Sequence, residues 1–307
     1  MNSQMQVPQV DILIIAYNQE KYIFDAIYSA INQTYKNTKI IVADDCSTDS
    51  TRLIIDDLYQ KYPDKIVKVY NDSNLGITVN SNKAIAASNG KYMVIMGGDD
   101  ILYPEKIYEQ VNWFDKNPKA SLCGHELDLI NEESRNIGDH TIPSVKKGSG
   151  AYKWIRYGML FGCISIMIKK DENENLHFDD RLLYASDLKF FIDFLGENKQ
   201  FGFIKRKLGA YRKVGTSITS SKWEICVSDS EKMYDILTIE KNSRFKLHII
   251  KGKNYSITYG YALRAFNEGN YRKAIFGFLS TIKSDRTNFK AYYRLMQSII
   301  SSLINYL

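Results

Sequence analysis

The feature that most constrains this chain is a regular alternation of short apolar runs with longer segments of helical spacing. The apolar runs are Val10–Ala16, Lys39–Ala43, Ile66–Tyr70 and Tyr92–Met96. Between them, apolar residues recur every three or four positions in Glu20–Gln33, Thr48–Tyr62 and Ile77–Ser88. Buried strands that alternate with helices of this length predict right-handed crossovers and a mostly parallel sheet flanked by helices. The sequence therefore predicts an α/β fold for this part of the chain.

Turn and capping residues predict where the helices and strands of the next part of the chain begin and end. We expect Ser47 to cap the helix Thr48–Tyr62, and Pro104 to begin a helix that ends near Lys116. Beyond it the pattern predicts strands at Ala120–Ile130, Phe161–Lys169, Phe201–Lys205 and Leu208–Lys213, and a helix at Ser186–Leu195. The segment Asn131–Gly150 is polar and contains glycine, so it is expected to be a loop and is a candidate flexible lid.

The last third of the chain differs in pattern and in charge. From about Ser221 the spacing is helical, with amphipathic helices expected at Ser256–Phe266, Tyr271–Ile282 and Phe289–Tyr306. Residues 241–307 hold 12 Lys and Arg against 2 Asp and Glu, whereas residues 1–240 hold 29 against 33. A chain of 307 residues suits one large domain with a smaller appendage. We therefore expect an α/β domain over residues 1–220 and a basic helical extension over residues 221–307.

The basic extension favours two interpretations. Its last segment is apolar and amphipathic, but it is too short and too polar to cross a bilayer. Basic amphipathic helices bind anionic lipid surfaces, so peripheral membrane contact is one interpretation. The other is a tail that packs on the body of the protein or on a second copy, as in a homodimer. We expect no nucleic-acid partner.

Cysteine spacing and the N-terminal sequence bear on the compartment. The four cysteines, Cys46, Cys123, Cys163 and Cys226, are far apart and show no C-x-x-C spacing. Neither a zinc site nor a dense disulfide framework is indicated. The first ten residues lack the basic-then-apolar layout of a signal peptide. We therefore expect a cytoplasmic protein, with peripheral contact at the inner face of the cytoplasmic membrane as an addition.

Polar side chains follow three of the predicted strands. Tyr17 and Asn18 follow the first strand, Asp44 and Asp45 end or follow the second, and the pair Asp99-Asp100 follows the fourth after two glycines. Ligands of parallel α/β sheets bind at the carboxyl ends of the strands. Paired carboxylates with no nearby His or Cys favour Mg²⁺ or Mn²⁺, through which a diphosphate can be held. An isolated Asp-Asp pair that only caps a helix is the alternative.

Five motifs that occur in order carry a resemblance to a known family. They are VDILIIAYNQE, KIIVADDCSTDST, NLGITVNSNKAI, GKYMVIMGGDDIL and LLYASDLKFFIDF. They resemble the family 2 glycosyltransferases, and the resemblance covers roughly residues 8–220. It implies the GT-A fold, a mostly parallel Rossmann-like sheet flanked by helices. It also implies inverting transfer of a sugar from a nucleotide-sugar to an acceptor hydroxyl, with Mn²⁺ or Mg²⁺ as cofactor.

The resemblance implies a role for each matching position. Tyr17 would stack on the donor base, Asp45 would accept a hydrogen bond from a uracil or thymine N–H, and Asp44 would stabilise the loop or reach the nucleoside. Asp99 would contact ribose or metal, Asp100 would bind metal, and Asp187 would be the catalytic base. Further donor contacts would come from Ala16, Asn18, Asn74 and Gly76. The implied partners are a UDP- or dTDP-sugar and a glycan or lipid-linked acceptor, in bacterial surface polysaccharide synthesis.

Several positions depart from the family pattern. Gly97 and Gly98 precede the acidic pair, Ser186 replaces the Glu that usually precedes the catalytic Asp, and Ser81 and Val214 replace a common Arg and His. These departures support an alternative, a degenerate GT-A domain that binds a nucleotide-sugar or a glycan without catalysis. The retained aspartates favour the enzyme. The basic residues Lys205, Arg206, Lys207 and Arg212 are expected either to face phosphates or to form a solvated strand edge.

Overall fold

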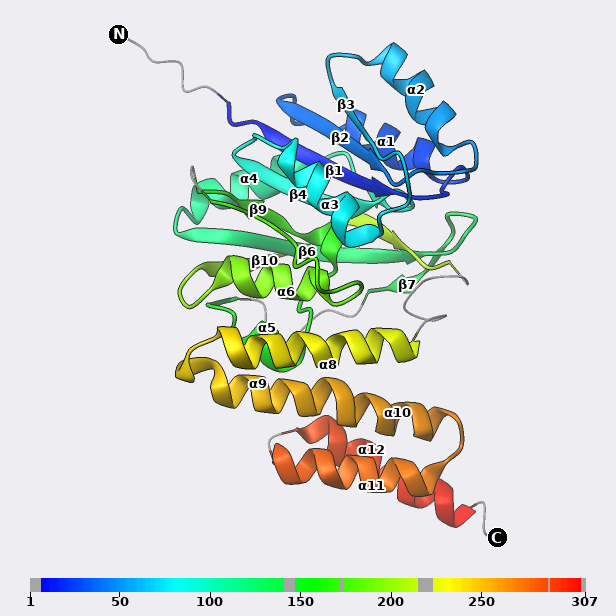
Figure 1. Ribbon diagram of the computed structural model, residues 1–307, viewed down its shortest axis with the longest axis vertical. Coiled ribbons are helices and arrows are strands. Elements are labelled where there is room, and N and C mark those ends of the chain that lie inside the picture. Colours follow the sequence, from blue (N-terminus) through cyan, green and yellow to red (C-terminus); the bar gives the residue numbers. More distant parts are fainter. Residues whose placement is uncertain (1–6, 141–146, 172–173, 215–222, 287, 305–307) are drawn as a thin grey trace. The chain divides into compact units, whose positions relative to one another are not determined.

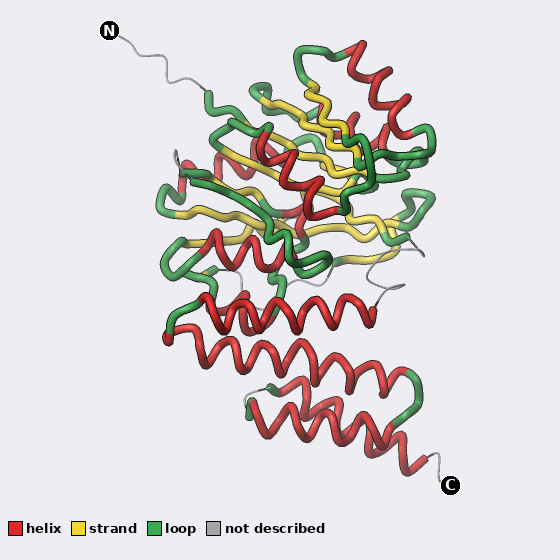
Figure 2. Tube along the Cα trace, in the orientation of Figure 1, coloured by secondary structure: helices red, strands yellow, loops and turns green. Residues whose placement is uncertain are grey.

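The computed structural model describes residues 7–140, 147–171, 174–214, 223–286 and 288–304. The chain divides into two compact units, one of residues 1–151 and 160–221, the other of residues 152–159 and 222–307. Figure 1 labels the elements of both, and Figure 2 shows the strands gathered in the first unit and helices alone in the second. The short helix α5 (Tyr152–Tyr157) thus belongs to the helical unit, although it lies within the first 220 residues.

The first unit is built on one sheet with the strand order β3-β2-β1-β4-β9-β6-β10-β5. Its first four strands are parallel: β1 (Val10–Ala16), β2 (Thr38–Asp44), β3 (Ile66–Tyr70) and β4 (Tyr92–Gly97). Strand β9 (Met167–Lys169) runs antiparallel between β4 and β6 (Ala120–Ile130). Strand β10 (Gln200–Arg212) is parallel to β6, and β5 (Ile101–Leu102) is antiparallel to β10. The α/β fold and the mostly parallel core of the sheet agree with the sequence prediction.

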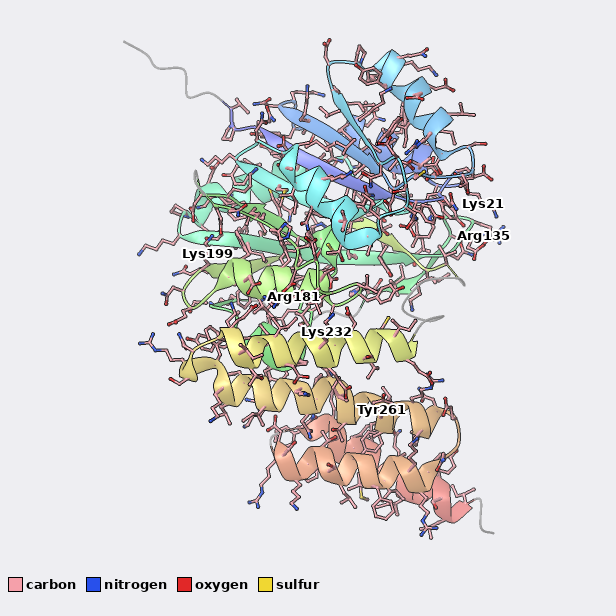
Figure 3. All side chains as sticks on the ribbon, viewed as in Figure 1. Lys21, Arg135, Arg181, Lys199, Lys232 and Tyr261 are labelled. Atoms are coloured by element: carbon pink, nitrogen blue, oxygen red, sulfur yellow. The ribbon has the colours of Figure 1, made fainter. Side chains whose placement is uncertain are left out.

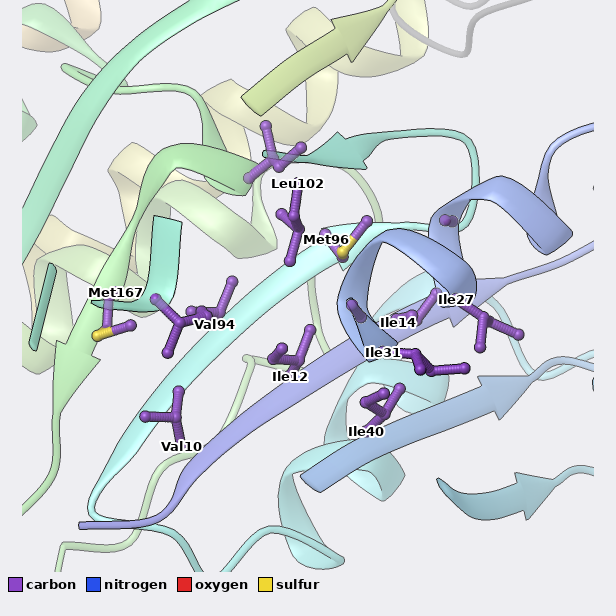
Figure 4. Close-up of a cluster of buried hydrophobic side chains, with 14 of the residues drawn as sticks. Val10, Ile12, Ile14, Ile27, Ile31, Ile40, Val94, Met96, Leu102 and Met167 are labelled. Carbon is purple, nitrogen blue, oxygen red and sulfur yellow. The ribbon is translucent and has the colours of Figure 1, made fainter. Parts of the chain in front are cut away.

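Helices cover both faces of this sheet. On one face, α1 (Ile23–Ile31) packs on β1 and β2, α2 (Thr51–Lys61) on β3, and α4 (Lys106–Lys116) on β6 and β10. All three helices contribute to one apolar cluster with Val10, Ile12 and Ile14 of β1. Figure 4 shows this apolar cluster, in which the side chains of α1 meet those of β1, β2 and β4. On the other face, α3 (Ile77–Ala86) packs on β1 and β2, and Figure 1 shows α6 (Ser186–Leu195) on the same side. Two-sided cover explains why these strands read as continuous apolar runs.

Element boundaries differ from the sequence prediction where polar side chains serve a loop. Helix α2 begins at Thr51, not at Thr48, and Ser47 does not cap it. The hydroxyl of Ser47 donates to Asp44, the N–H of Thr48 donates to Asn18 Oδ1, and the N–H of Ser50 donates to Glu20 Oε2. These side chains and amides are used between loops, so the helix starts only after them.

Three further predictions are corrected in the second half of the sheet. The segment 131–150 is not only loop, because it contains β7 (Asn136–Asp139) and β8 (Gly148–Ser149), and its residues 141–146 lie outside the described part. The expected strand Phe161–Lys169 is a 3-10 turn (Cys163–Ser165) followed by the short β9. The two expected strands within 201–213 form the single strand β10. Bulges interrupt its pairing with β6, and they lie where the sequence predicts a break between two strands.

The second unit is helical throughout its described residues. After α5 it contains α8 (Trp223–Glu240), a 3-10 turn (Ser243–Phe245), α9 (Lys246–Lys253), a π-helical segment (Asn254–Tyr259), α10 (Gly260–Asn267), α11 (Tyr271–Ser284) and α12 (Phe289–Ile304). Small residues Ala262, Ala274 and Ala291 surround Phe278 in a core of their own. An ion pair of 2.7 Å joins Arg156 of α5 to Asp285 after α11.

Candidate functional site

The polar residues predicted from the sequence lie at the carboxyl ends of neighbouring parallel strands. Ala16, the last residue of β1, lies opposite Asp44, the last residue of β2. On the other side of β1, Ile15 lies opposite Gly97, the last residue of β4. The loops that follow these strands therefore meet at one edge of the sheet, where α/β folds bind ligands.

Asp44 is a structural residue of this edge. Its side chain is fully buried. The carboxylate accepts hydrogen bonds from the hydroxyl and the N–H of Ser47 and from Arg52 Nε at 2.5 Å, and Arg52 in turn donates to the Asn71 carbonyl. The bonds of this carboxylate among the described residues go to the loop that follows β2 and to the first turn of α2. Of the two roles expected for Asp44, the geometry supports loop stabilisation.

Asp45 holds the loop that precedes α3. Its Oδ1 accepts hydrogen bonds from Asn71 Nδ2 and the Leu75 N–H, both at 2.8 Å, and its Oδ2 accepts one from the Gly76 N–H at 2.8 Å. Gly76 has a φ of +86°, which a side chain would strain. The Asp45 N–H donates to the Ala16 carbonyl at 3.0 Å. A backbone hydrogen bond therefore joins these two residues, both of which are predicted to contact the sugar donor. Asn74 lies in the same loop and is exposed.

The loop after β1 is braced by the loop before α2. The Asn18 N–H donates to Ser47 Oγ at 2.9 Å, and its side-chain Oδ1 accepts from the Thr48 N–H at 2.8 Å. Asn18 has a φ of +49°, a conformation that asparagine tolerates better than most residues. Tyr17, immediately before it, is 45% exposed, so a rigid loop presents an aromatic ring at the edge of the sheet.

The acidic pair after β4 depends on the two glycines before it. A Cβ on Gly97 would lie 2.5 Å from Asp99 Oδ1, and a Cβ on Gly98 would overlap Gln19 Oε1. The glycines therefore let the two carboxylates and the loop after β1 come close together. Burial raises the pKa of the Asp99 carboxyl, and burial together with the Asp99 charge raises the pKa of Asp100 well above its usual range.

Arg212, the last residue of β10, holds this acidic pair in place. Its backbone N–H donates to Asp100 Oδ1 at 3.0 Å, and its Nε donates to the Asp99 carbonyl at 2.8 Å. Nη1 donates to the Asn131 carbonyl at 2.8 Å and to Ser134 Oγ at 3.0 Å. The side chain is 2% exposed, and its Nη2 is buried with no hydrogen-bond partner among the described residues. A buried guanidinium with one donor to spare suits a site that receives an anion.

Asp187 lies in the first turn of α6, and the residue is half-buried. Burial raises its pKa to about 6, against the lowering effect of the Leu188 N–H, which donates to Oδ1 at 2.6 Å. The start of α6 is attached to α3, because the Thr78 hydroxyl donates to the Leu182 carbonyl at 2.7 Å and contacts Ser186 Oγ at 3.1 Å. Ser186, which stands where the family has Glu, is thus a buried packing contact.

The three carboxylates act electrostatically on the same neighbouring side chains. Burial raises the pKa of the Cys163 thiol, and the charges of Asp187 and Asp100 raise it further. The charges of Asp99, Asp100 and Asp187 all act on the phenol of Tyr211 and raise its pKa further than burial alone. Both side chains are therefore within electrostatic range of Asp100 and of Asp187, which are 87 positions apart in the sequence. The predicted base and the predicted metal ligands thus share two electrostatic neighbours.

The acidic pair fits a divalent cation that also binds substrate oxygens. No group of three or more His, Cys, Asp or Glu that could hold a metal occurs among the described residues, so the chain does not supply a complete coordination shell there. Within that part of the chain, no other side chain bonds to the Asp99 carboxylate, whereas Asp100 Oδ1 is already bonded to Arg212. Mg²⁺ commonly takes one or two carboxylates and completes its shell with phosphate oxygens and water.

Some of the residues that shape the site were missed or misplaced by the sequence analysis. Arg212 was grouped with Lys205, Arg206 and Lys207, but only Arg212 is buried at the site. Arg206 pairs with Glu109, and Lys207 pairs with Asp128 and Asp139. The signal that separates Arg212 is its position at the end of β10, as the second residue of the segment YRKVGTSIT (211–219), of which residues 215–219 lie outside the described part.

The fold, with helices on both faces of a mostly parallel sheet, is that of the GT-A type glycosyltransferases. The model of the family described as "Glycosyl transferase family 2" matches residues 11–173, more than half of the chain. The chain therefore belongs to glycosyl transferase family 2 and is a glycosyltransferase.

Known relatives and solved structures agree with this assignment. TuaG of Bacillus subtilis, provisionally named a teichuronic acid biosynthesis glycosyltransferase, is 27% identical over 218 residues, which are 71% of this chain and 84% of TuaG. Residues 1–349 of Staphylococcus aureus TarS in complex with UDP-GlcNAc share the fold, with a TM-score of 0.66, 16% identity, and coverage of 97% of this chain and 89% of that one. The mannosyltransferase PcManGT of Pyrobaculum calidifontis, solved with GDP-Man and Mn²⁺, gives a TM-score of 0.57, 14% identity, and coverage of 98% and 87%.

Proposed function

We propose that this protein is an inverting glycosyltransferase that transfers a sugar from a UDP- or dTDP-sugar to a hydroxyl of a glycan or lipid-linked acceptor. The observation that carries the proposal is that Asp187 and the Asp99-Asp100 pair all lie within electrostatic range of Tyr211, at the strand end where β10 meets the acidic pair. We assign this chemistry to the domain of residues 1–220, with residues 221–307 as its helical extension.

The donor nucleotide is held by the loops at the strand ends. Tyr17 offers an exposed aromatic face on which a base can stack. Asp45 Oδ2 accepts only the Gly76 N–H among the described residues, so it has capacity for the N–H of uracil or thymine. Ala16, Asn18, Asn74 and Gly76 surround these two side chains in the adjoining loops. Cytosine lacks that N–H in its neutral form, which is why UDP or dTDP is proposed.

The diphosphate is met by the acidic pair and the arginine behind it. Asp99 and Asp100 would hold Mn²⁺ or Mg²⁺. The bound cation would neutralise the negative charge that develops on the leaving diphosphate. Arg212 fixes the acidic pair through its backbone N–H and Nε, and its buried Nη2 remains as a donor. The same packing excludes water from the base of the site.

Asp187 is the proposed general base. A carboxyl with a pKa of about 6 is ionised at neutral pH, yet it is basic enough to accept the proton of an attacking hydroxyl. The acceptor oxygen would attack the anomeric carbon from the face opposite the diphosphate, as its proton passes to Asp187 and the diphosphate leaves. One base and one direct displacement give inversion, and no second carboxylate is required as a nucleophile.

The names of two relatives suggest the setting. TuaG is named for teichuronic acid biosynthesis, and GgaB of Bacillus subtilis is named as a minor teichoic acid biosynthesis protein. Both of those names refer to surface polysaccharides. The proposal therefore extends to surface polysaccharide synthesis on the cytoplasmic side of the membrane, with a glycan or lipid-linked acceptor.

The second unit offers a surface for peripheral membrane contact. Along α12, Phe289, Tyr293, Met296, Ile300 and Leu303 lie on one face, and their side chains are between 52% and 80% exposed. Helix α12 carries Lys290 and Arg294 but no acidic residue. An apolar face with basic neighbours suits an anionic bilayer. No described helix is long and apolar enough to span a membrane. Cosedimentation with anionic vesicles tests this contact, and a dimer in light scattering would favour a second copy instead.

The direct test is donor binding and slow donor hydrolysis across a panel of UDP-, dTDP-, GDP- and CMP-sugars, with Mn²⁺ and with EDTA. We expect one UDP- or dTDP-sugar to bind in a metal-dependent manner and to release its nucleotide slowly. Anomeric configuration of the transferred sugar, read by NMR, tests inversion. Failure of folded protein to bind any nucleotide-sugar in the presence of metal would overturn the donor-site assignment.

A further inference from the structure

A groove of about 960 Å³ lies in the first unit between the end of α4, the turn into β6, strand β8 and the start of β10. We call it the Trp113 groove. Its lining includes Trp113, Asn117, Lys119, Lys147, Gln200 and Phe203. Its volume is at the upper end of the range of ligand sites, roughly 300–1,000 Å³. The proposed function makes no use of it.

The Trp113 groove lies at the opposite edge of the sheet from the site of transfer. Strands β6 and β10 run in the same direction as β4, because β9 is antiparallel to both β4 and β6. The groove is beside their first residues, whereas Arg212, which contacts Asp99, is the last residue of β10. Strand β6, whose 11 residues pair with β10 from Gln200 to Arg212, spans about 33 Å. Figure 3 shows the same separation, with Lys199 at one edge of this unit and Lys21 and Arg135 at the other.

One wall of the groove is a fixed aromatic ring. Trp113 is half-buried and packs edge to face on Phe114, with ring centroids 5.4 Å apart. A Cβ on Gly202 would overlap the six-membered ring of the indole, so the ring rests directly on the backbone of β10. Glycine at this position lets the tryptophan lie against the strand. A rigid indole with an accessible portion provides the apolar surface on which a sugar ring can pack.

The charged side chains that line the groove are both cationic. Lys119 and Lys147 are exposed, and no ion pair joins either of them to another described residue. A third lysine, Lys169, lies next to the turn that holds Lys119, with its Nζ 2.5 Å from the Pro118 carbonyl and 5.8 Å from the centre of the Phe114 ring. No acidic residue is among the described residues that line the groove. The amides of Asn117 and Gln200 add hydrogen-bonding groups of the kind that hydroxyls require. This combination attracts anions that also carry polar rings.

We propose that the Trp113 groove binds an anionic glycan, which is the polymeric acceptor of the transfer reaction. The identification of this glycan as the acceptor rests on the proposed function, but binding at the groove can be tested independently of it. Sugar rings would pack on Trp113, and the phosphate or carboxylate groups of the chain would lie near Lys119 and Lys147. A chain held in this groove, at the opposite edge of the sheet from the acidic pair, keeps its growing end at a high effective concentration. Acceptors of several repeats would then be used better than short ones.

The test is binding of fluorescein-labelled decasaccharides, measured by anisotropy: hyaluronan, sulfated dextran, and neutral dextran of the same length, with inorganic polyphosphate as a polyanion without sugar rings. We expect both anionic glycans to bind at least about tenfold tighter than neutral dextran and polyphosphate. The variant Lys119→Glu/Lys147→Glu should weaken that binding by about tenfold or more. The control Lys36→Glu/Lys61→Glu, which changes two exposed lysines elsewhere in the same unit by the same charge, should stay within about twofold.

Each outcome decides the matter. Equal weakening by the control variant, equal binding of polyphosphate, or no binding of either anionic glycan at about 1 mM would overturn the proposal. A second variant, Trp113→Phe, with its melting temperature measured, should weaken glycan binding more than polyphosphate binding. UDP binding is followed in every variant and should not change. If the wild-type protein does not bind UDP, the proposed function would be contradicted. Binding of the anionic glycans would still support the Trp113 groove as a glycan site.

Discussion

The Arg212 backbone N–H donates to Asp100 Oδ1 at 3.0 Å, although the two residues are 112 positions apart. Through this bond the last residue of β10 fixes the carboxylate that follows β4. The same arginine reaches the Asp99 carbonyl with Nε and the Asn131 carbonyl with Nη1. Because its guanidinium is 2% exposed, the arrangement is rigid and dry, as a site that holds a charged ligand requires.

Replacing this arginine should therefore damage both stability and donor binding. Arg212→Lys keeps the charge but removes the planar fork that reaches Asn131 and Ser134, and the ammonium would be left buried with fewer partners. We expect a loss of about 2–4 kcal/mol in the free energy of unfolding in urea, together with weaker binding of UDP and Mn²⁺. Arg206→Lys, on the same strand, is the control, because Arg206 only pairs with Glu109 at the surface. A fully stable Arg212→Lys protein would contradict this account.

Asp187→Asn should abolish transfer while leaving donor binding intact. Removal of a general base costs about 10²–10⁴-fold in rate, whereas Asp187 makes no contact expected to hold the nucleotide. We expect kcat to fall by that factor and the Kd of UDP to stay within about twofold. Asp57→Asn, an exposed charge on α2, is the matched control and should leave kcat unchanged. Normal turnover by the Asp187→Asn protein would exclude the residue as the base.

The same residue gives a dependence of stability on pH with a defined sign. Burial raises the pKa of Asp187 from the ordinary value of 3.8 to about 6 in the folded state. The folded state therefore holds this proton more tightly than the unfolded chain does, so its stabilising effect is complete below about pH 3.8 and is lost as pH rises through about 6. At pH 7.5 the ionised, buried carboxylate of Asp187 therefore lowers the free energy of unfolding.

It follows that Asp187→Asn should be more stable than the wild type at pH 7.5. A shift of this size corresponds to at most about 3 kcal/mol, and we expect a gain of about 1–3 kcal/mol in EDTA, which shrinks towards zero near pH 4. Thermal unfolding of both proteins across this range provides the measurement. In the wild type, the rate of transfer should also fall as pH drops below about 6, because the base becomes protonated. A gain that is equal at both pH values would show that desolvation of the charge is not its cause.

A methyl group at Gly98 should displace two neighbouring side chains. A Cβ there would overlap Gln19 Oε1 and lie 2.9 Å from Ile23 Cδ1, so the ends of both side chains would have to shift beside the acidic pair. Gly98→Ala should cost about 1–3 kcal/mol of stability and should weaken donor binding. Gly260→Ala is the control: nothing lies within 4 Å of its Cβ position and its φ of −59° is helical, so it should be neutral or slightly stabilising. Chemical denaturation with UDP titrations decides between these outcomes.

The alternation of strands and helices, and the polar groups at the strand ends, could be predicted because both follow from local pattern. The roles of Asp44 and Asp45 could not be separated in this way. The two residues are adjacent and chemically identical, yet one is bonded to Ser47 and Arg52, and the other to a loop that begins 26 positions later. Which loop each carboxylate meets is set by tertiary packing.

The position of Arg212 was unpredictable for a similar reason. Its distance in sequence from Asp100 is large, and its charge resembles that of the exposed Arg206 and Lys207 nearby. The start of α2 was misplaced because Thr48 and Ser50 satisfy the loop after β1, which a capping rule applied to local sequence does not consider. Local rules fail here at residues whose partners come from another strand end.

The link between α3 and α6 should control how well Asp187 is placed. The Thr78 hydroxyl donates to the Leu182 carbonyl at 2.7 Å and lies 3.1 Å from Ser186 Oγ, so it sets where α6 begins. Thr78→Val keeps the shape of the side chain but leaves that buried carbonyl without its donor, at a cost of about 1–3 kcal/mol. The first turn of α6 should then shift or loosen, and a small displacement of a catalytic group can lower the rate by about 10- to 100-fold.

The effect of Thr78→Val should appear in kcat and not in donor affinity, because Asp45 and Tyr17 do not depend on this contact. Thr78→Ser restores the hydroxyl and loses only a methyl group, so it should recover most of the lost rate while remaining somewhat less stable than the wild type. Steady-state kinetics with UDP titrations on the three proteins separate the cases. If Thr78→Ser were as slow as Thr78→Val, packing of the methyl group rather than the hydrogen bond to Leu182 would position α6. If both variants lost UDP affinity in proportion to rate, the contact would belong to the donor site rather than to Asp187.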